Sequence, residues 1–326
     1  MKAVFYERQG PADDVLRVGE VETPSPGAGE VLVRLRATGV NPSDVKRRSG
    51  LRGLTMGFPR ITPHSDGAGV IEAVGSGVPS GRVGERVWLW NAQYQRSMGT
   101  AAEYIALPAE QAVTLPETVD FDVGACAGIP LMTAAHAVNI ARLTPGMTVF
   151  VSGGAGAVSQ YIIQLAARRG ANVLASCSND EKAALAYRAG AKAVVDYRTE
   201  SIADFVAEQT GGKGAARLFE VDLSANSLLI PQILAPHGDV IAYGLGEETM
   251  PLPGMWMLRN SARLTFFLAY TFSPEERRAA IDVIQDALRD TTMIHTTVRY
   301  DGLEGTAQAH RDVERGMIGN AVVVVA

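Results

Sequence analysis

The amino-acid sequence predicts an α/β protein with two domains, a mostly antiparallel β domain and a doubly wound parallel sheet. Three observations predict this class. The chain has 326 residues, more than a single hydrophobic core usually organises. The first 120 residues are dense in turn residues and short β-branched runs. From about residue 125 the pattern changes to strands that alternate with helices, which is typical of a parallel sheet.

The first part of the chain contains four short β-type runs. VLVRLRATGV (31–40) and GAGVIEAVGSGV (67–78) are bounded by glycine and proline. ERVWLW (85–90) and AAEYIALPA (101–109) continue the same pattern. Strands and turns in this succession predict the mostly antiparallel β domain.

The second part begins with TVFVS (148–152), a short apolar strand that follows the Pro145-Gly146 turn. Apolar residues at helical spacing predict a helix over 157–169, and Gly170 fits its C-terminal end. The following elements are predicted in this order: strand NVLAS (172–176), helix 180–190, strand AVVDY, helix 200–210, strand RLFEV, helix 224–235, strand DVIAYG and strand LTFFLAY (264–270).

The last part of the chain predicts a long helix and a strand. Ser273 fits the N-cap of the helix, and Pro274 fits its first position. The tail NAVVVVA predicts a terminal strand, which we expect to return to the first domain.

Composition limits the classes of function. Hydrophobic residues make up 47% and charged residues 20% of the chain, as in soluble globular proteins. The formal net charge is −5 and no basic cluster occurs, so a nucleic-acid partner is not expected. Cys126 and Cys177 are too few for a disulfide framework. Without a signal peptide or a membrane-length apolar run, the sequence predicts a cytoplasmic protein with no membrane partner.

The stretch GGAGAVS (153–159) resembles the glycine fingerprint of a dinucleotide site. It joins a predicted strand to a predicted helix, and Gly154 and Gly156 would let the backbone approach a pyrophosphate. Ser159 stands where the fingerprint usually has its third glycine. Because serine is small, we expect close helix–strand packing to survive. A tight turn without a ligand is the alternative interpretation.

The end of the next strand indicates which dinucleotide would bind. NAD sites usually carry an acid there that binds the ribose 2′-hydroxyl. This chain has Leu174-Ala-Ser-Cys-Ser178, and its first acid, Asp180, comes later. The missing acid favours NADPH, with Ser178, Lys182 and Arg198 as candidate phosphate partners. For Lys182 and Arg198 a solvated surface charge is the alternative.

The predicted cofactor-binding residues belong to the glycine turn and to segments that follow later strands. They are Gly153, Gly154, Ala155, Gly156, Ala157, Val158, Ser178, Lys182, Tyr197, Arg198, Gly244, Leu245 and Phe267.

Over nearly its whole length the chain resembles a known family. The matching stretches are GVNPSDVKRRSG (39–50), SDGAGVIEAVGSGV (65–78), GACAGIPLMTAAHAV (124–138), VSGGAGAV (151–158) and GAKAVVDYR (190–198). They resemble the zinc-independent, zeta-crystallin-like quinone oxidoreductase branch of the medium-chain dehydrogenase/reductase superfamily.

The resemblance implies a fold, a cofactor and an assembly. A GroES-like catalytic domain, residues 1–124 and 270–326, would surround an NADP-binding Rossmann domain, residues 125–269. The implied cofactor is NADPH. The implied assembly is a homodimer or homotetramer that is joined through the nucleotide-binding domains.

Zinc is not expected. Zinc-using relatives have a cysteine where this chain has Asn41 and a His-Glu pair where it has Ser65-Asp66. Their third ligand position corresponds to Ile129. His64 lies one residue from the histidine position, but we interpret it as a structural loop residue.

The resemblance also implies catalytic residues. Asn41 would lie at the substrate side of the nicotinamide, and Thr133 would contact the cofactor near its ring. Relatives carry tyrosines where this chain has Lys46 and Arg52, two cations that could stabilise a developing oxyanion. Two solvated charges are the alternative interpretation. His136 is expected to pack in a helix rather than to act as an acid.

The sequence therefore predicts an NADPH-dependent reductase of quinones or other α,β-unsaturated carbonyls that works by hydride transfer without zinc. Two alternatives stay open. One is an enoyl-thioester reductase, which would need a basic groove for a phosphate-bearing carrier. The other is a non-catalytic structural or RNA-binding role, against which the acidic balance argues.

Overall fold

The structure is a computed structural model that describes residues 1–325, apart from the side chain of Arg52. The chain divides into two compact units. The first is Met1–Leu131 with Gln285–Ala326, and the second is Met132–Ile284. The expected domain boundaries after residues 124 and 269 stay predictions.

The first unit is built on a mostly antiparallel sheet, in which only the two strands at one edge pair in parallel. Within the described residues its strands follow the order β14-β15-β3-β4-β5-β7, with β6 paired to β3, and β1 pairs with β2 separately. The strands are β1 (Lys2–Phe5), β2 (Arg17–Glu20), β3 (Glu30–Val40), β4 (Asp66–Val74), β5 (Arg86–Leu89), β6 (Tyr104–Pro108), β7 (Ala112–Thr114), β14 (Thr297–Asp301) and β15 (Asn320–Val324). The helices are α1 (Ala12–Val15), α2 (Pro42–Ser49), α3 (Phe121–Gly124) and α12 (Thr306–Glu314).

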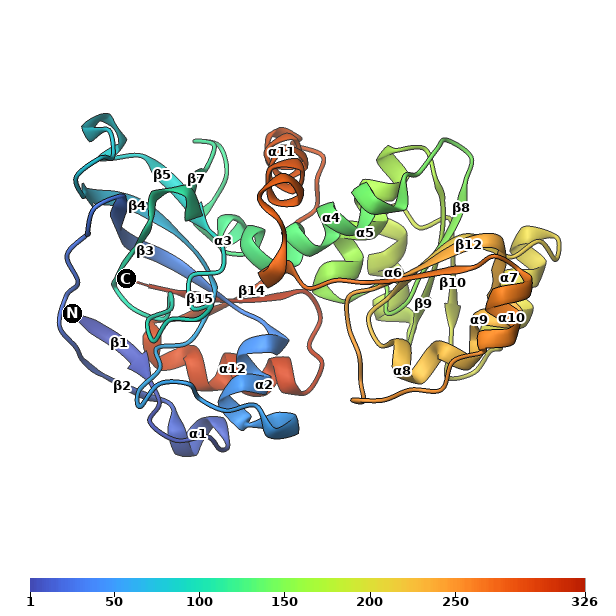
Figure 1. The fold of residues 1–326 in the computed structure, drawn as a ribbon, viewed down its shortest axis with the longest axis horizontal. Helices are drawn as coiled ribbons and strands as arrows, with labels where there is room; N and C mark the ends of the chain where they lie inside the picture. The colour runs from blue at the N-terminus through green and yellow to red at the C-terminus, as the bar shows by residue number, and fades with distance from the viewer. Residues whose placement is uncertain (326) are drawn as a thin grey trace. The chain divides into compact units, whose positions relative to one another are not determined.

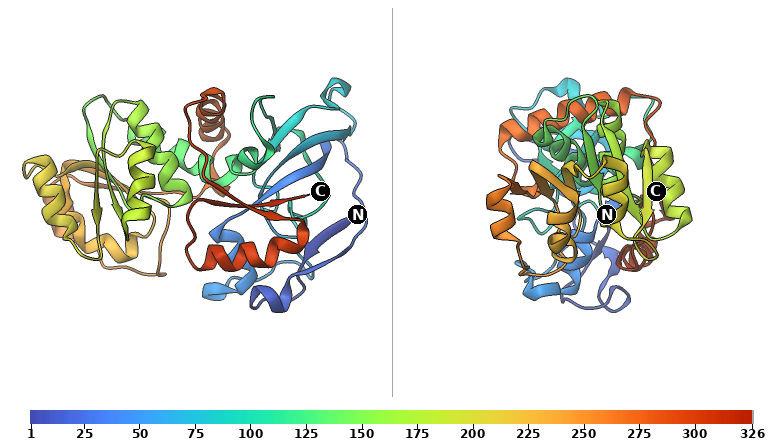
Figure 2. Two further views of the ribbon diagram at one scale, coloured as in Figure 1. Left: turned by 180° about the vertical axis from the view of Figure 1, so that it is seen from behind. Right: turned by 90° about the vertical axis from the view of Figure 1, so that its right-hand side faces the viewer.

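The expected return of the C-terminal tail to this unit is confirmed. Strand β15 pairs antiparallel with β3, with Val323 opposite Thr38. Helix α12 packs against α1 and α2, so the last elements lie beside the first ones (Figures 1 and 2).

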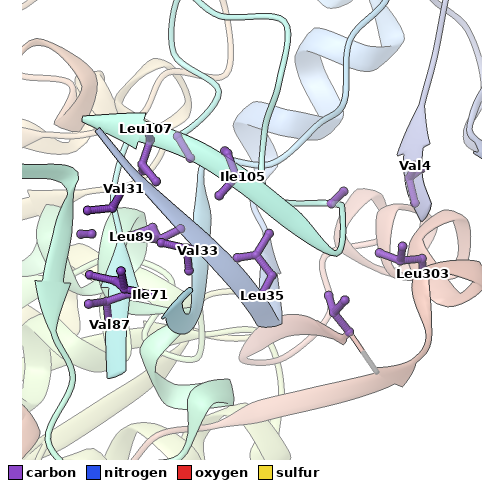
Figure 3. Close-up of a cluster of buried hydrophobic side chains, with 14 residues drawn as sticks. Val4, Val31, Val33, Leu35, Ile71, Val87, Leu89, Ile105, Leu107 and Leu303 are labelled. Carbon is purple, nitrogen blue, oxygen red and sulfur yellow. The ribbon is translucent and has the colours of Figure 1, made fainter. Parts of the chain in front are cut away.

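Alternating residues of the long strand β3 form the core of the first unit. Val31, Val33 and Leu35 are fully buried and point to one side, as the period of a strand requires. Figure 3 shows them packed with the side chains of neighbouring strands. Burial of a side chain of this size contributes roughly 1.5–3 kcal/mol, so this cluster stabilises the framework that holds the end of β3.

The second unit contains a parallel sheet with the strand order β10-β9-β8-β11-β12-β13 in the described part of the chain. This is the strand order of a doubly wound sheet: successive strands are added on one side of β8 up to β10, and on its other side from β11 onward. Its strands are β8 (Thr148–Val151), β9 (Asn172–Cys177), β10 (Ala193–Asp196), β11 (Ala215–Glu220), β12 (Leu234–Ala242) and β13 (Arg263–Phe266). Its helices are α4 (Met132–Ala141), α5 (Ala157–Arg168), α6 (Asp180–Ala189), α7 (Ile202–Thr210), α8 (Leu223–Asn226), α9 (Ile230–Ile233), α10 (Gly254–Arg259) and α11 (Pro274–Arg289), of which α11 crosses the boundary of the unit.

Helices cover both faces of this sheet. Figure 1 shows α4, α5 and α6 on one face and α7, α9 and α10 on the other. The fold class expected from the sequence, an antiparallel β domain with a doubly wound parallel sheet, is therefore confirmed.

Two expected elements differ from the structure. The helix expected over 224–235 is broken into α8, a 3₁₀ turn (Ser227–Leu229) and α9, and Leu234 already belongs to β12. Pro231 removes a backbone donor at the start of α9, which is consistent with the break. The strand expected over 264–270 ends at Phe266. The expected start of α11 is correct, because the Ser273 hydroxyl accepts a hydrogen bond from the backbone N–H of Glu276 at 3.2 Å.

Among the described residues, no helix is both long and apolar enough to cross a membrane.

Candidate functional site

The predicted cofactor-binding residues lie along the side of the parallel sheet that is formed by the carboxyl ends of its strands. Each of them follows the carboxyl end of a strand: residues 153–158 follow β8, Ser178 and Lys182 follow β9, Tyr197 and Arg198 follow β10, Gly244 and Leu245 follow β12, and Phe267 follows β13. Ligands of open α/β sheets bind on this side, where the strand order reverses. The topology thus brings together residues that are more than 100 positions apart.

The glycine turn lies close against β9 and α6. Gly153 has a φ of +61°, a backbone conformation that favours glycine, and the Gly154 amide donates to the carbonyl of Ser176 at 2.8 Å. A Cβ atom on Gly154 would lie 3.1 Å from the Cβ of Ala175 and 3.2 Å from that of Ala186. Larger residues would therefore push the turn away from the sheet.

Helix α5 begins directly after this turn with an open N-terminus. Its N-cap is Gly156, and no side chain of the described residues caps the helix. The first backbone N–H groups of a helix have no partner within the helix, and together they favour an anion. The turn and the helix together fit the pyrophosphate of a dinucleotide.

Ser159 takes the place of the third glycine and is buried. Its hydroxyl donates to the carbonyl of Ser152 at 3.0 Å and lies 2.9 Å from the hydroxyl of Tyr243. The serine therefore ties α5 to the end of β8 and to the segment after β12. Close helix–strand packing survives as expected, and it does so through two hydrogen bonds.

A buried acid, Glu220, ends strand β11 beside the reversal point. Burial raises its pKa to about 7, although hydrogen bonds from Asn226 and Ser152 lower it. The Asn226 amide donates to its carboxyl group at 3.0 Å. Burial, and secondarily the charge of Glu220, raises the pKa of Tyr243. Nothing near Glu220 in the sequence marks it as buried, so the sequence pattern does not indicate this cluster.

The residues expected near a 2′-phosphate surround the end of β9. Ser178 is buried, whereas Tyr197 and Arg198 are exposed. Lys182 lies in the first turn of α6 and forms no ion pair within the part of the chain that the structure describes. Burial raises the pKa of the Cys177 thiol to about 11, and the charge of Lys182 acts in the opposite direction.

One acid near this position is not indicated by the sequence pattern. Asp196, at the end of β10, is paired in register with Cys177. Its carboxylate accepts the backbone N–H of Arg198 at 2.9 Å. It lies on the neighbouring strand rather than at the end of β9, so only the sheet register shows that it is near.

In the first unit, Asn41 lies at the end of β3 and is the N-cap of α2. The backbone N–H of Asn41 donates to the carboxyl group of Asp44 at 2.8 Å, and the Asn41 side chain faces the backbone N–H of Asp44 in a capping box. The side-chain Nδ2 of Asn41 donates to Oδ2 of Asp66 at 2.8 Å. Asn41 is thus held between two acids.

Both acids are buried and shifted toward their neutral forms. Burial raises the pKa of Asp44 to about 7, opposed mainly by the hydrogen bond from the Asn41 backbone and by the charge of Arg47. Burial raises the pKa of Asp66 well above its ordinary range, and the Asn41 side chain lowers it. The Asn-x-x-Asp spacing of a capping box could have indicated Asp44, whereas no signal indicated Asp66 as a partner of Asn41.

A pair of buried histidines lies in the same polar cluster. The Nε2 atoms of His64 and His310 are 3.0 Å apart, and Nδ1 of His64 is 2.9 Å from the hydroxyl of Thr38. Burial lowers the pKa of His64 to about 3 and that of His310 well below its ordinary value. His64 is therefore part of a packed polar cluster, as its interpretation as a structural residue requires.

The other predicted catalytic residues are placed as follows. Lys46 is half-buried on α2, the helix that Asn41 caps. Arg52 lies in the 3₁₀ turn Leu51–Gly53, and its side chain lies outside the described residues. Thr133 is buried in α4 of the second unit. His136, on the same helix, is 4.1 Å from Phe272 between ring centroids, which agrees with a packing role.

Metal binding would need several ligating side chains in one place. In residues 1–325 no group of three or more His, Cys, Asp or Glu side chains is arranged to hold a metal ion.

Comparisons with known proteins match both units. Residues 27–117 match the alcohol dehydrogenase GroES-like domain, and residues 157–286 match the zinc-binding dehydrogenase family. A human quinone oxidoreductase is 30% identical over 320 residues, which cover 97% of this chain and 94% of the human protein. A 2-haloacrylate reductase of a Burkholderia species is 34% identical over 251 residues, 75% of this chain and 73% of that protein.

Solved structures show the same similarity. A mycobacterial protein in complex with NADPH superposes with a TM-score of 0.87 at 28% identity, covering 99% of this chain and 100% of that one. With the GroES-like and Rossmann folds and the full-length similarity taken together, the chain belongs to the quinone oxidoreductase branch of the medium-chain dehydrogenase/reductase superfamily and is an oxidoreductase.

Proposed function

We propose that this protein is an NADPH-dependent reductase of quinones or other α,β-unsaturated carbonyls, and that it transfers hydride without zinc. One observation carries the proposal. The glycine turn meets the uncapped N-terminus of α5 at the reversal point of the sheet, and the end of β9 lacks the acid typical of NAD sites. The mycobacterial relative solved with NADPH supports the same cofactor.

The chain's own residues suggest how the cofactor would be held. The open amides of α5 would bind the pyrophosphate, with the glycines allowing the close approach. Ser178, Lys182 and Arg198 would bind the 2′-phosphate, Lys182 and Arg198 through charge-assisted hydrogen bonds. Asp196 would face the same region, where its carboxylate would repel the 2′-phosphate. The hydrogen bond that this carboxylate accepts from the Arg198 backbone N–H would reduce that repulsion. Thr133 would contact the cofactor near the nicotinamide.

Bound NADPH supplies the hydride, and the protein supplies position and polarisation. Asn41 would donate a hydrogen bond to the acceptor carbonyl. Lys46 and Arg52 would stabilise the negative charge that develops on its oxygen. In the sequence a tyrosine acid is absent from positions 46 and 52, so the final proton would come from solvent or from a polar side chain.

Binding and turnover test the proposal separately. Tryptophan fluorescence titrated with NADPH and NADH should show tighter binding of NADPH, and equal affinities would contradict the 2′-phosphate argument. NADPH oxidation should then be followed against quinones, enones, enoyl thioesters and 2-haloacrylates. Turnover with at least one conjugated carbonyl is expected, and none with any of them would reject the reductase.

The panel includes two further classes for specific reasons. 2-Haloacrylates are included because a relative is named for their reduction. Enoyl thioesters test the remaining enzymatic alternative. A strong preference for either would narrow the proposed acceptor class without changing the hydride chemistry.

We also propose that a second copy of this chain is the partner of the second unit. In the described part of the chain, strand β13 lies at the edge of its sheet and pairs with β12 alone, so its other side can accept a further strand. Phe266 at its end and Leu268 just after it are 49% and 59% exposed, and Met255 and Leu258 of α10 are 61% and 75% exposed. Exposed apolar groups beside an open sheet edge fit a homodimer that continues the sheet.

A further inference from the structure

The side chain of Asn41 is fixed by two neighbours of opposite hydrogen-bonding character. On one side it faces a donor, the backbone N–H of Asp44. On the other side it meets an acceptor, Oδ2 of Asp66, at 2.8 Å. An amide with its oxygen and nitrogen exchanged would face donor to donor and acceptor to acceptor. The orientation of the amide is therefore determined by its neighbours.

This orientation uses only part of the hydrogen-bonding capacity of Asn41. Its oxygen faces the start of α2, and one of its two Nδ2–H groups is donated to Asp66. The second Nδ2–H has no acceptor among the described residues. Such a donor needs a hydrogen-bond acceptor, which the carbonyl oxygen of a substrate can provide.

Asp66 itself is held firmly. It begins β4, where it pairs in register with Gly39. Its backbone carbonyl accepts hydrogen bonds from the hydroxyls of Thr38 and Thr100. Its Oδ1 lies against Gly128, where a Cβ atom would come within 2.5 Å of it. The carboxyl group therefore has little freedom to follow the amide if Asn41 rotates.

We propose that Asp66 is a positioning residue, which holds the Asn41 amide so that its second Nδ2–H points to the carbonyl oxygen of the acceptor. This role rests on the proposed reductase function, because it concerns the donor to that acceptor. Asp66 itself donates no proton to the acceptor in this scheme.

The shape of Asp66 allows a conservative variant. Burial raises its pKa well above the ordinary range, which favours the neutral form of the carboxyl group. A carboxamide has the same shape and also offers one acceptor oxygen. Asp66→Asn should therefore keep the bond to Asn41, whereas Asp66→Ala removes it. A proton-donating role would give the opposite result for Asp66→Asn, because an amide is not an acid at neutral pH.

The test is a double-mutant cycle on Asn41 and Asp66. With an acceptor that the wild type reduces, D66A should lower kcat about 10- to 100-fold, with KM for NADPH unchanged. D66N should stay within about threefold of wild type. In the Asn41→Ala background, D66A should cause no further loss, because a positioning residue acts only through its partner.

Controls separate this role from general destabilisation. Thr306→Val removes another buried hydroxyl of the first unit, which donates to the carbonyl of Leu303 at 2.7 Å rather than to Asp66, so it should lower Tm but keep kcat. If D66A does not fold, Asp66→Ser, which is shorter but still polar, takes its place. Unchanged kcat in the folded variant, or an equal loss in the N41A background, would overturn the proposal, as would inactivity of D66N.

A second readout does not depend on turnover. The side-chain amide signals of Asn41, identified by their loss in N41A, should show slow hydrogen exchange in wild type and D66N and fast exchange in D66A. If wild type reduces no acceptor, the reductase proposal fails while this result still judges the Asn41–Asp66 contact. Equal exchange in wild type and D66A would overturn the positioning role even in an active enzyme.

Discussion

Among single residues, Asp44 and the histidine pair His64 and His310 respond to pH in opposite directions. The folded state holds a proton on Asp44 more tightly than the unfolded state, since burial raises its pKa from 3.8 to about 7. Its contribution to stability is therefore complete below pH 3.8 and is lost as the pH rises to about 7. The histidines are neutral when folded, so their contribution is complete above pH 6.5 and falls on acidification.

Replacing Asp44 by asparagine should remove one of these two responses. The side-chain carbonyl of the introduced asparagine can still accept the Asn41 backbone N–H, but the amide does not titrate. Between pH 5 and 7 the stability of D44N relative to wild type should rise by about 1 kcal/mol per pH unit. Urea unfolding at pH 5, 6, 7 and 8 measures this difference, in which the shared histidine contributions cancel. A flat difference would show that Asp44 titrates normally.

Ser159 is the second residue whose contribution to the free energy of unfolding can be measured. In Ser159→Ala the hydroxyl of the half-buried Tyr243 loses its partner, which should cost about 1–3 kcal/mol in the free energy of unfolding. Ser159→Gly restores the usual fingerprint, but it should cost about 1 kcal/mol more because glycine disfavours helix. The double variant S159A/Y243F should recover part of the loss. Wild-type stability of S159A would contradict the role of these two bonds.

Lys182 tests the choice of cofactor. Alanine at this position removes a positive charge near the end of β9, so affinity for NADPH should fall about 10- to 100-fold while that for NADH stays the same. Lys192 provides the control, because it directly precedes β10 and thus lies at the amino ends of the strands, away from the predicted cofactor site. K192A should bind both cofactors like wild type. Equal losses of NADPH and NADH in K182A would reject the assigned contact.

At the scale of elements, two properties compete at the start of α5 in the strand–turn–helix unit β8–α5: helix stability and anion binding. A side-chain cap would stabilise the helix, but it would occupy the amides that an anion needs. Gly156 provides no cap and leaves them open. The sequence of this turn therefore favours ligand binding over helix stability.

Gly156→Asp should separate these two properties. Its backbone, with a φ of −70°, suits any residue, and aspartate is a strong N-cap, although the new Cβ lies 3.3 Å from the Gly153 carbonyl oxygen. The free energy of unfolding should stay within about 1 kcal/mol of wild type. Affinity for NADPH should fall more than about 100-fold, because a carboxylate replaces the phosphate. Gly156→Ser, which caps without charge, is the control and should lose less. Tight NADPH binding by G156D would argue against this anion site.

At the scale of the whole molecule, β13 in the second unit and β14 in the first are both edge strands of their sheets, but they differ in the residues they expose. Helix α10, which precedes β13 in the chain, carries the exposed Met255 and Leu258, and Phe266 at the end of β13 is exposed as well. The edge strand β14 of the first unit carries the exposed Val298, together with the charged Arg299 and Asp301. Charges on an edge oppose pairing with another chain. Strand β13 also carries one exposed charged residue, Arg263, but its guanidinium is paired with Asp239 of the neighbouring strand.

Assembly through β13 is testable by a matched pair of lysine variants. Phe266→Lys should shift the protein from dimer toward monomer in sedimentation experiments, whereas Val298→Lys should leave the assembly unchanged. Both replace an exposed apolar edge residue, so their effects on the fold should be similar. A dimer in both variants would indicate a different interface, and a monomeric wild type would reject the second copy as partner.

The sequence by itself determined the two-sheet organisation, the family and the position of the glycine turn. These depend on local patterns: hydrophobic periodicity, turn residues and short motifs that act within about 30 residues. The assigned cofactor and catalytic residues stay predictions, because the structure positions them without testing their roles. The expected helix over 224–235 was wrong because a helical pattern alone did not weigh Pro231 and the early start of β12.

Only the tertiary structure decided which polar groups meet. Asp66 reaches Asn41 because β4 pairs with β3, Asp196 reaches Cys177 through the register of β10, and His310 meets His64 from a helix 246 residues away. Strand register and helix packing create such contacts between residues with no fixed spacing in the sequence. The same burial that brings these groups together shifts their pKa values, so the electrostatics around Asn41 became visible only in the folded chain.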